Sequence, residues 1–136
     1  DQFWKVGIQH PRNNIAFASI QLKPGWSIGT SGDYQRYFIS NNKRYSHLIN
    51  PFTGYPVHHT QSATIIIPPK EDSEILSDVL SKPIYLSPIE DKVKLANQLQ
   101  INYFLIILDD GKILISQDMN NHIEWLDDKE KNVEIY

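Results

Sequence analysis

The sequence has no cysteine and a single methionine among its 136 residues. The lack of cysteine excludes disulfides, thiolate zinc sites and cysteine nucleophiles. The longest strongly apolar run, Phe104–Leu108, is far shorter than the roughly 18 residues that a membrane-spanning helix needs. The chain shows no charged-then-apolar signal segment and starts abruptly at Asp1, already in strand-like alternation. We therefore expect a piece cut from inside a larger protein.

The sequence also carries little net charge. The net charge is −3, and the lysines and arginines are scattered rather than gathered in one patch, so we expect no nucleic-acid partner. Apolar residues make up 40% and charged residues 21%, which is typical of a soluble globular protein. A chain of this length can form one domain with a real core, so residues 1–136 are expected to form a single domain or subdomain.

The first half of the chain reads as strands. Runs of β-branched and aromatic residues predict them at Phe3–Ile8, Ile15–Leu22, Trp26–Thr30 and Ala63–Ile67. Tyr34–Ile39 and Lys43–Ile49 flank an Asn-rich turn and predict a hairpin, because asparagine tolerates the left-handed region. A second hairpin is predicted from Phe104–Leu108 and Ile113–Ser116.

The second half predicts two helices. The first is capped by Asp72 or Ser73 and runs to about Lys82, where Pro83 would stop it. The second has Ser87 as its N-cap, in a capping box that ends at Glu90. Strands followed by helices and a hairpin predict an α+β fold with a mostly antiparallel sheet and two helices.

The stretch from Thr30 to Pro56 is the first candidate for a site. Gly32 allows the backbone to approach a ligand closely, and the hydroxyls beside it, including that of Ser31, can bind phosphate oxygens. The alternative is a turn that ends a strand, with Asp33 as a helix cap.

His47 also has two interpretations. On a strand it shares a face with Tyr45 and Ile49, which favours a half-buried histidine. It can instead serve as a proton acceptor or a phosphate donor, because imidazole titrates near neutrality. The pair His58-His59 is a poor metal site, because adjacent residues on a strand point to opposite faces.

Asp78, Ser81 and Lys82 share one face of the first predicted helix. Asp78 and Ser81 could supply two oxygen ligands to a hard cation such as magnesium. Spacing alone favours the alternative, an i,i+4 ion pair between Asp78 and Lys82.

Taken in order, these segments resemble the C-terminal part of the FAD:protein FMN transferase family, the ApbE-like flavin transferases. The matching pieces are Trp4-Lys5-Val6-Gly7-Ile8, His10-Pro11, Thr30-Ser31-Gly32-Asp33-Tyr34, Arg44-Tyr45-Ser46-His47-Leu48-Ile49-Asn50-Pro51, Thr53-Gly54 and the helix that carries Asp78. The glycine-rich and flavin-contacting segments that come earlier in the family are absent from this sequence.

The resemblance implies an activity: FMN moves from FAD to a threonine hydroxyl of a partner flavoprotein, AMP leaves, and magnesium neutralises the diphosphate. It makes His47 the active-site histidine and brings the backbone of Leu48 to the flavin cofactor. Ser31 and Asp33 would shape the wall of the site, and Asp78 would be a magnesium ligand, with Ser81 beside it. The resemblance further implies a lipid-anchored protein on the periplasmic side of the bacterial inner membrane.

Two residues depart from the family pattern. Asn50 stands where an aspartate usually precedes the proline, and Lys82 stands where the helix usually carries a metal-binding threonine. An ammonium group cannot ligate a cation and would repel one. The alternatives are therefore a catalytically impaired FAD-binding protein or an inactive scaffold fragment.

Overall fold

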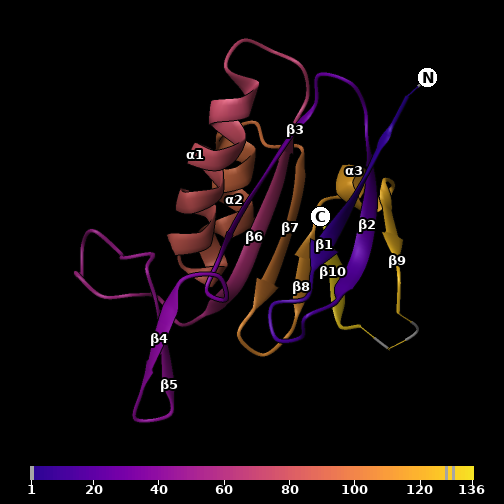
Figure 1. Cartoon of the computed structure of the whole chain (residues 1–136). Coiled ribbons are helices and arrows are strands. Elements are labelled where there is room, and N and C mark those ends of the chain that lie inside the picture. Colours follow the sequence, from indigo (N-terminus) through magenta and orange to yellow (C-terminus); the bar gives the residue numbers. More distant parts are fainter. Residues whose placement is uncertain (1, 128, 130) are drawn as a thin grey trace.

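The computed structural model of the chain describes residues 2–127, 129 and 131–136. Its largest sheet has five strands, in the order β10 (Val133–Ile135), β8 (Ile113–Ile115), β7 (Tyr103–Leu108), β6 (Thr60–Ile67) and β3 (Ser27–Gly32). A second sheet has the order β1 (Trp4–Gln9), β2 (Ala16–Leu22) and β9 (Ile123–Trp125). Among the described strands of these two sheets, β8 and β10 form the one parallel pair. The predicted α+β class with mostly antiparallel pairing is confirmed (Figure 1).

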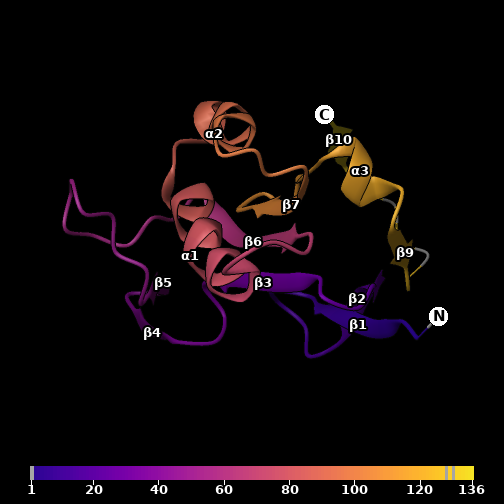
Figure 2. The same cartoon turned by 90° about the horizontal axis from the view of Figure 1, so that it is seen from above.

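The elements form three layers. Helices α1 (Ser73–Leu86) and α2 (Lys92–Gln98) cover one face of the five-stranded sheet (Figure 2). The three-stranded sheet packs on its other face, and the short helix α3 (Gln117–Asn120) adds Met119 to that second core. No described helix is both long enough and apolar enough to cross a membrane.

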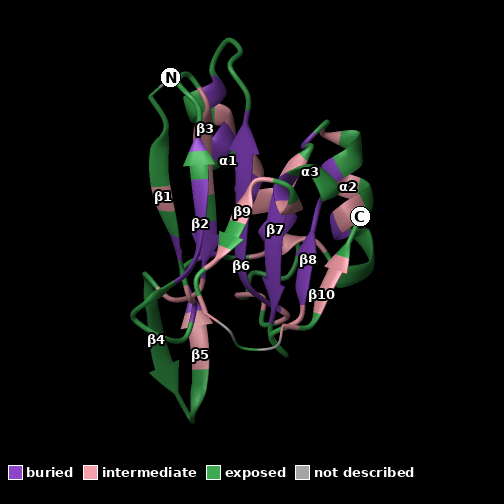
Figure 3. Cartoon of the chain, turned by 90° about the vertical axis from the view of Figure 1, so that its right-hand side faces the viewer, coloured by how far each residue is buried: buried purple, intermediate pink, exposed green. Residues whose placement is uncertain are grey.

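The central strands are buried on both faces, as Figure 3 shows for β6 and β7. Ala63, Ile65 and Ile67 pack in the core under the helices, while Ile66 packs between the two sheets. Fully burying one such aliphatic side chain stabilises the fold by about 1.5–3 kcal/mol. The five-stranded sheet is therefore tightly packed, and it supports the segments that lie against its edge strand, β3.

Helix α1 lies against β3 through small side chains. Gly29 has no room for a side chain, because a Cβ there would lie 2.1 Å from the main-chain oxygen of Ser77. Two hydroxyl pairs flank this contact: Ser27 with Ser73 at 3.2 Å, and Ser31 with Ser81 at 2.7 Å. This close packing determines which face of α1 points toward the end of β3.

The Asn-rich turn forms the predicted hairpin, β4 (Tyr37–Ser40) and β5 (Lys43–Ser46), which projects from the body of the molecule (Figure 1). Asn41 and Asn42 have φ values of 49° and 58°, the left-handed conformation for which asparagine is suited. The second hairpin, β7 with β8, is confirmed as well.

The prediction that Pro83 stops the first helix is wrong, because α1 continues to Leu86. Proline removes one helical hydrogen bond, but Ile84 and Tyr85 in the following turn are 0% exposed, so core packing holds that turn in place. The predicted start is right, with Asp72 at the N-cap position, although its side chain makes no capping hydrogen bond with a described residue.

The capping box at the second helix is also wrong. Ser87 ends α1 instead: its amide donates to the carbonyl of Pro83 at 2.9 Å, and its hydroxyl donates to that of Ile84 at 3.1 Å. A 3₁₀ turn, η1 (Ile89–Asp91), then leads into α2. The sequence prediction also missed α3, β9 and β10, which are only three or four residues long.

Candidate functional site

A small pocket lies where β3, the β4–β5 hairpin and α1 meet. We call it the β3–α1 pocket; it measures about 150 Å³ and is lined by Thr30, Ser31, Gly32, Gln35, Arg36, His47, Leu48, Asp78 and Lys82. Four of the six predicted site residues line it, namely Ser31, His47, Leu48 and Asp78. Segments far apart in the sequence therefore line one pocket.

His47 follows β5 directly and is exposed, so the half-buried interpretation is wrong. Its ring Nδ1 lies 3.1 Å from the main-chain oxygen of Arg36, and its amide donates to the same oxygen at 3.1 Å. A carbonyl can only accept, so Nδ1 is the donor in this hydrogen bond. The neutral ring consequently carries its lone pair on Nε2, where it can accept a proton.

Leu48 and Ser46 lie on the buried side of the same segment. The amide of Leu48 donates to the hydroxyl of Ser46 at 3.3 Å, which helps to hold the turn after His47. The alternation of faces that the sequence predicted is thus correct, but the Ser46 and Leu48 face is the inner one.

Ser81 lies beneath the pocket rather than on its wall. Its side chain is 0% exposed; its hydroxyl donates to the carbonyl of Asp78 at 2.8 Å and pairs with the hydroxyl of Ser31 at 2.7 Å. Asp78, by contrast, is at the surface and forms the ion pair that its spacing favoured, with its Oδ1 2.8 Å from Nζ of Lys82.

Asp33 faces a different partner. Both of its carboxylate oxygens accept from the guanidinium of Arg12, at 2.6 and 2.7 Å, and the carboxylate raises the pKa of Arg12. Asp33 lies in the irregular segment between β3 and β4, where no helix begins, so its interpretation as a helix cap is wrong. The pair ties the loop after β1 to the end of β3, close to the pocket.

The sequence prediction missed Arg36, although a signal for it existed. Pairing counted back from the Asn41-Asn42 turn sets Tyr37 opposite Ser46, which places Arg36 opposite His47. The segment that leads into the hairpin thus adds a second positively charged residue to the pocket lining, in addition to Lys82.

The donor set of the pocket does not fit the magnesium ion that the resemblance implies. Asp78 is the one carboxylate among the nine lining residues, all of which the structure describes, and it is already paired with Lys82. The hydroxyl of Ser81 points into the protein, where it is already hydrogen-bonded to the hydroxyl of Ser31 and the carbonyl of Asp78. Magnesium requires several oxygen ligands in octahedral geometry, which these groups do not present. No group of three metal-binding side chains occurs among the described residues.

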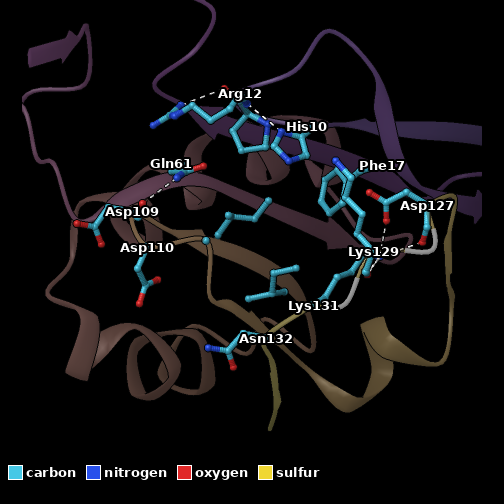
Figure 4. A pocket seen from close by; sticks show the side chains of 14 residues that line it. His10, Arg12, Phe17, Gln61, Asp109, Asp110, Asp127, Lys129, Lys131 and Asn132 are labelled. Atoms are coloured by element: carbon cyan, nitrogen blue, oxygen red, sulfur yellow. Dashed lines mark hydrogen bonds and ion pairs between the residues drawn. The ribbon is translucent and has the colours of Figure 1, made fainter. Parts of the chain in front are cut away.

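A larger pocket of about 420 Å³ is lined mainly by the loop after β1, the turn between β7 and β8, and the segment before β10 (Figure 4). Two pairs of its polar groups bind each other: Gln61 donates to the carbonyl of Asp109 at 3.0 Å, and Lys131 forms an ion pair with Asp127. None of the predicted site residues is among its described lining residues. The β3–α1 pocket is therefore the better candidate.

The fold agrees with the resemblance to flavin transferases, and so does comparison with known proteins. Residues 1–105 match the model of the ApbE family. The chain is 31% identical to the FAD:protein FMN transferase of Rhodobacter capsulatus, over 89% of this chain and 22% of that protein. It is 30% identical to the FAD:protein FMN transferase of Haemophilus influenzae, over 79% of this chain and 31% of that protein.

Solved structures give the same result. The ApbE protein of Thermotoga maritima superposes with a TM-score of 0.76 at 33% identity, over 90% of this chain and 38% of that one. The flavinyl transferase ApbE of Pseudomonas stutzeri, in its apo form, gives a TM-score of 0.63 at 26% identity, over 88% and 36%. The chain belongs to the ApbE family. It spans between about a fifth and a third of the two curated relatives.

Proposed function

We propose that the protein is a flavin transferase that moves FMN from FAD to a threonine hydroxyl of a partner flavoprotein and releases AMP. Membership of the ApbE family supports this activity, as do the FAD:protein FMN transferases among its relatives. The observation that carries the proposal is the position of His47 in the β3–α1 pocket, where its Nε2 makes no hydrogen bond with a described residue and can accept a proton.

In the proposed reaction, the threonine oxygen of the acceptor attacks the phosphorus of the FMN half of FAD. A threonine O–P bond forms, the P–O bond to AMP breaks, and AMP leaves with its own phosphate. Nε2 of His47 takes the hydroxyl proton, and the hydrogen bond from Nδ1 to the carbonyl of Arg36 holds the ring for that transfer. No step is assigned to magnesium, because the donor set does not fit it.

The other residues would bind and position the cofactor. We assign the flavin contact to the backbone of Leu48 and part of the pocket wall to Ser31. Asp33 would act indirectly, because its carboxylate is held by Arg12 and so anchors the loop beside β3.

A direct test is to incubate the full-length protein with FAD and a flavoprotein acceptor, with and without divalent cations. Covalent FMN on the acceptor, seen as fluorescence on a denaturing gel, is the expected result. A His47→Gln variant should lose transfer while it still binds FAD. Absence of transfer with every metal tested would refute the enzymatic proposal.

The ion pair between Lys82 and Asp78 favours a second candidate function, FAD binding without transfer. Such a protein would bind FAD equally well with EDTA present and would leave the acceptor unmodified. A titration of the 136-residue chain with FAD, followed by flavin fluorescence, separates this from a scaffold fragment that binds nothing.

We also propose that the full-length protein is lipid-anchored on the periplasmic side of the bacterial inner membrane. Support comes only from the family resemblance. Fractionation of cells that express the full-length protein, with protease added from outside the inner membrane, tests it; recovery in the cytosol would refute it.

A further inference from the structure

The β3–α1 pocket has an excess of positive charge. Its nine lining residues, all described, include the basic residues Arg36 and Lys82, and Asp78 is the single carboxylate among them. His47 adds an imidazole that can donate or accept. An anion is therefore a better match to the pocket than a divalent cation.

Lys82 lies where it can change partner. Its Nζ is 2.8 Å from Oδ1 of Asp78 and 3.0 Å from the main-chain oxygen of the same residue. The side chains of Lys82 and Asp78 are 42% and 73% exposed, and exposed i,i+4 pairs of this kind are weak. A more highly charged anion could thus draw the ammonium group away from Asp78 at little cost.

Arg36 adds a second positive residue to the lining of the pocket, from another segment than Lys82. Lys82 comes from α1, whereas Arg36 comes from the segment before β4, and its backbone is fixed by the two hydrogen bonds from His47. A guanidinium offers a planar fork to phosphate oxygens, and an ammonium offers a compact point charge. The two together suit an anion with oxygens on more than one side.

The size of the pocket limits the ligand. Pockets that enclose a whole drug-sized molecule measure about 300–1,000 Å³. The β3–α1 pocket, at about 150 Å³, can take a charged group of a larger molecule rather than the whole of it.

We propose that Lys82 and Arg36 bind the diphosphate of a dinucleotide in the β3–α1 pocket, and that the ammonium group of Lys82 takes the place of a divalent cation. The choice of a diphosphate rests on the proposed function, because FAD brings this group to the site. Ser81 contributes to the packing of α1 on β3 and not to a metal.

Calorimetry with inorganic pyrophosphate tests the proposal without the transfer reaction. The protein should bind pyrophosphate in EDTA, and added Mg²⁺ should not tighten binding. A Lys82→Met variant should bind at least about tenfold more weakly, as expected for one lost charge-assisted hydrogen bond. Lys82→Arg should retain binding, and Lys94→Met, at an exposed position on α2, is the matched control that should change nothing.

Replacement of Asp78 gives a second test, because a lysine-held anion and a metal-held anion predict opposite changes in pyrophosphate affinity. If Lys82 holds the anion, Asp78→Asn removes a competing negative charge, and pyrophosphate should bind about fivefold more tightly in EDTA. If a metal holds the anion, the same substitution removes a ligand and binding should weaken.

The outcomes separate this proposal from the proposed function. Binding that needs Mg²⁺ and weakens with Asp78→Asn overturns the role of Lys82 and leaves the transferase activity standing. Absence of pyrophosphate binding with and without Mg²⁺ also overturns it. Metal-independent binding that needs Lys82, in a full-length protein that transfers no FMN, upholds the phosphate site and refutes the transferase.

Discussion

Lys92 carries a buried ammonium group at the end of α1, and its replacement by methionine gives a stability prediction with a defined sign. The residue is 0% exposed. Its Nζ donates to the main-chain oxygens of Ile84 at 2.8 Å, Tyr85 at 2.9 Å and Ser87 at 2.8 Å. A helix leaves its last carbonyls without an intrahelical donor. Lys92 supplies one to the turn that follows Pro83.

The magnitude follows from the two protonation states. Burial lowers the pKa of Lys92 from 10.5 to about 7. The unfolded chain therefore keeps this proton up to about pH 10, whereas the folded chain releases it near pH 7. Between these pH values the unfolded chain binds more protons than the folded chain, so a rise in pH increases the free energy of unfolding. The full difference corresponds to roughly 5 kcal/mol, of which about 2 kcal/mol falls between pH 7 and 9.

The assay is urea unfolding at pH 7, 8 and 9, followed by tryptophan fluorescence. Between pH 7 and 9, the free energy of unfolding of the unmodified protein should rise by about 2 kcal/mol more than that of Lys92→Met, because the other titrating groups are common to both. Lys94→Met should follow the unmodified protein. Parallel curves for the protein and Lys92→Met would refute the reasoning, since the three carbonyls would then favour the ammonium form as strongly as burial disfavours it.

Three further substitutions test the packing and the site. Gly29→Ala should cost about 1–3 kcal/mol or more in urea unfolding, because its Cβ would meet the Ser77 carbonyl, whereas Gly54→Ala, in open space at φ +72°, should cost only about 1–2 kcal/mol of backbone strain. Equal losses would contradict the close contact. Tyr85→Phe should lower the free energy of unfolding by less than about 1 kcal/mol or even raise it, because the buried hydroxyl has the side chain of Ser46 within reach but makes no well-formed hydrogen bond with a described residue. A larger loss of stability would reveal such a bond. His47→Gln should lower the rate of FMN transfer at saturating FAD by about 10²–10⁴-fold with little change in FAD affinity, and a variant that keeps its rate would remove His47 from the chemistry.

The sequence predicted the elements whose signal is local. The β4–β5 hairpin depends on Asn41 and Asn42, and the structure places both in the left-handed conformation that the turn requires. The buried strands β6 and β7 were recognisable from their apolar, β-branched residues. The i,i+4 pair of Asp78 and Lys82 was likewise predictable from spacing on one helix.

The predictions from sequence are wrong where tertiary contacts override a local rule. Pro83 is expected to end the helix, but α1 continues past it because Ile84 is packed in the core and Lys92 donates to the carbonyl of Ile84. Ser87 and Glu90 have the spacing of a capping box, yet the hydroxyl of Ser87 is already used by the end of α1. Neither competing contact is visible in the sequence, since each depends on how segments meet in space.

The candidate site shows the same division. His47 and Ser31, predicted from their own motifs, line the pocket, but the inward orientation of the Ser81 hydroxyl follows from how closely α1 lies on β3. That distance is set by Gly29, where the main chain of Ser77 takes the space of a side chain. A bulkier residue at Gly29 would push α1 away, and Asp78 and Lys82 would then move relative to His47. The chemistry of the pocket therefore depends on a residue that does not line it, and stability and ligand binding should change together when this contact is altered.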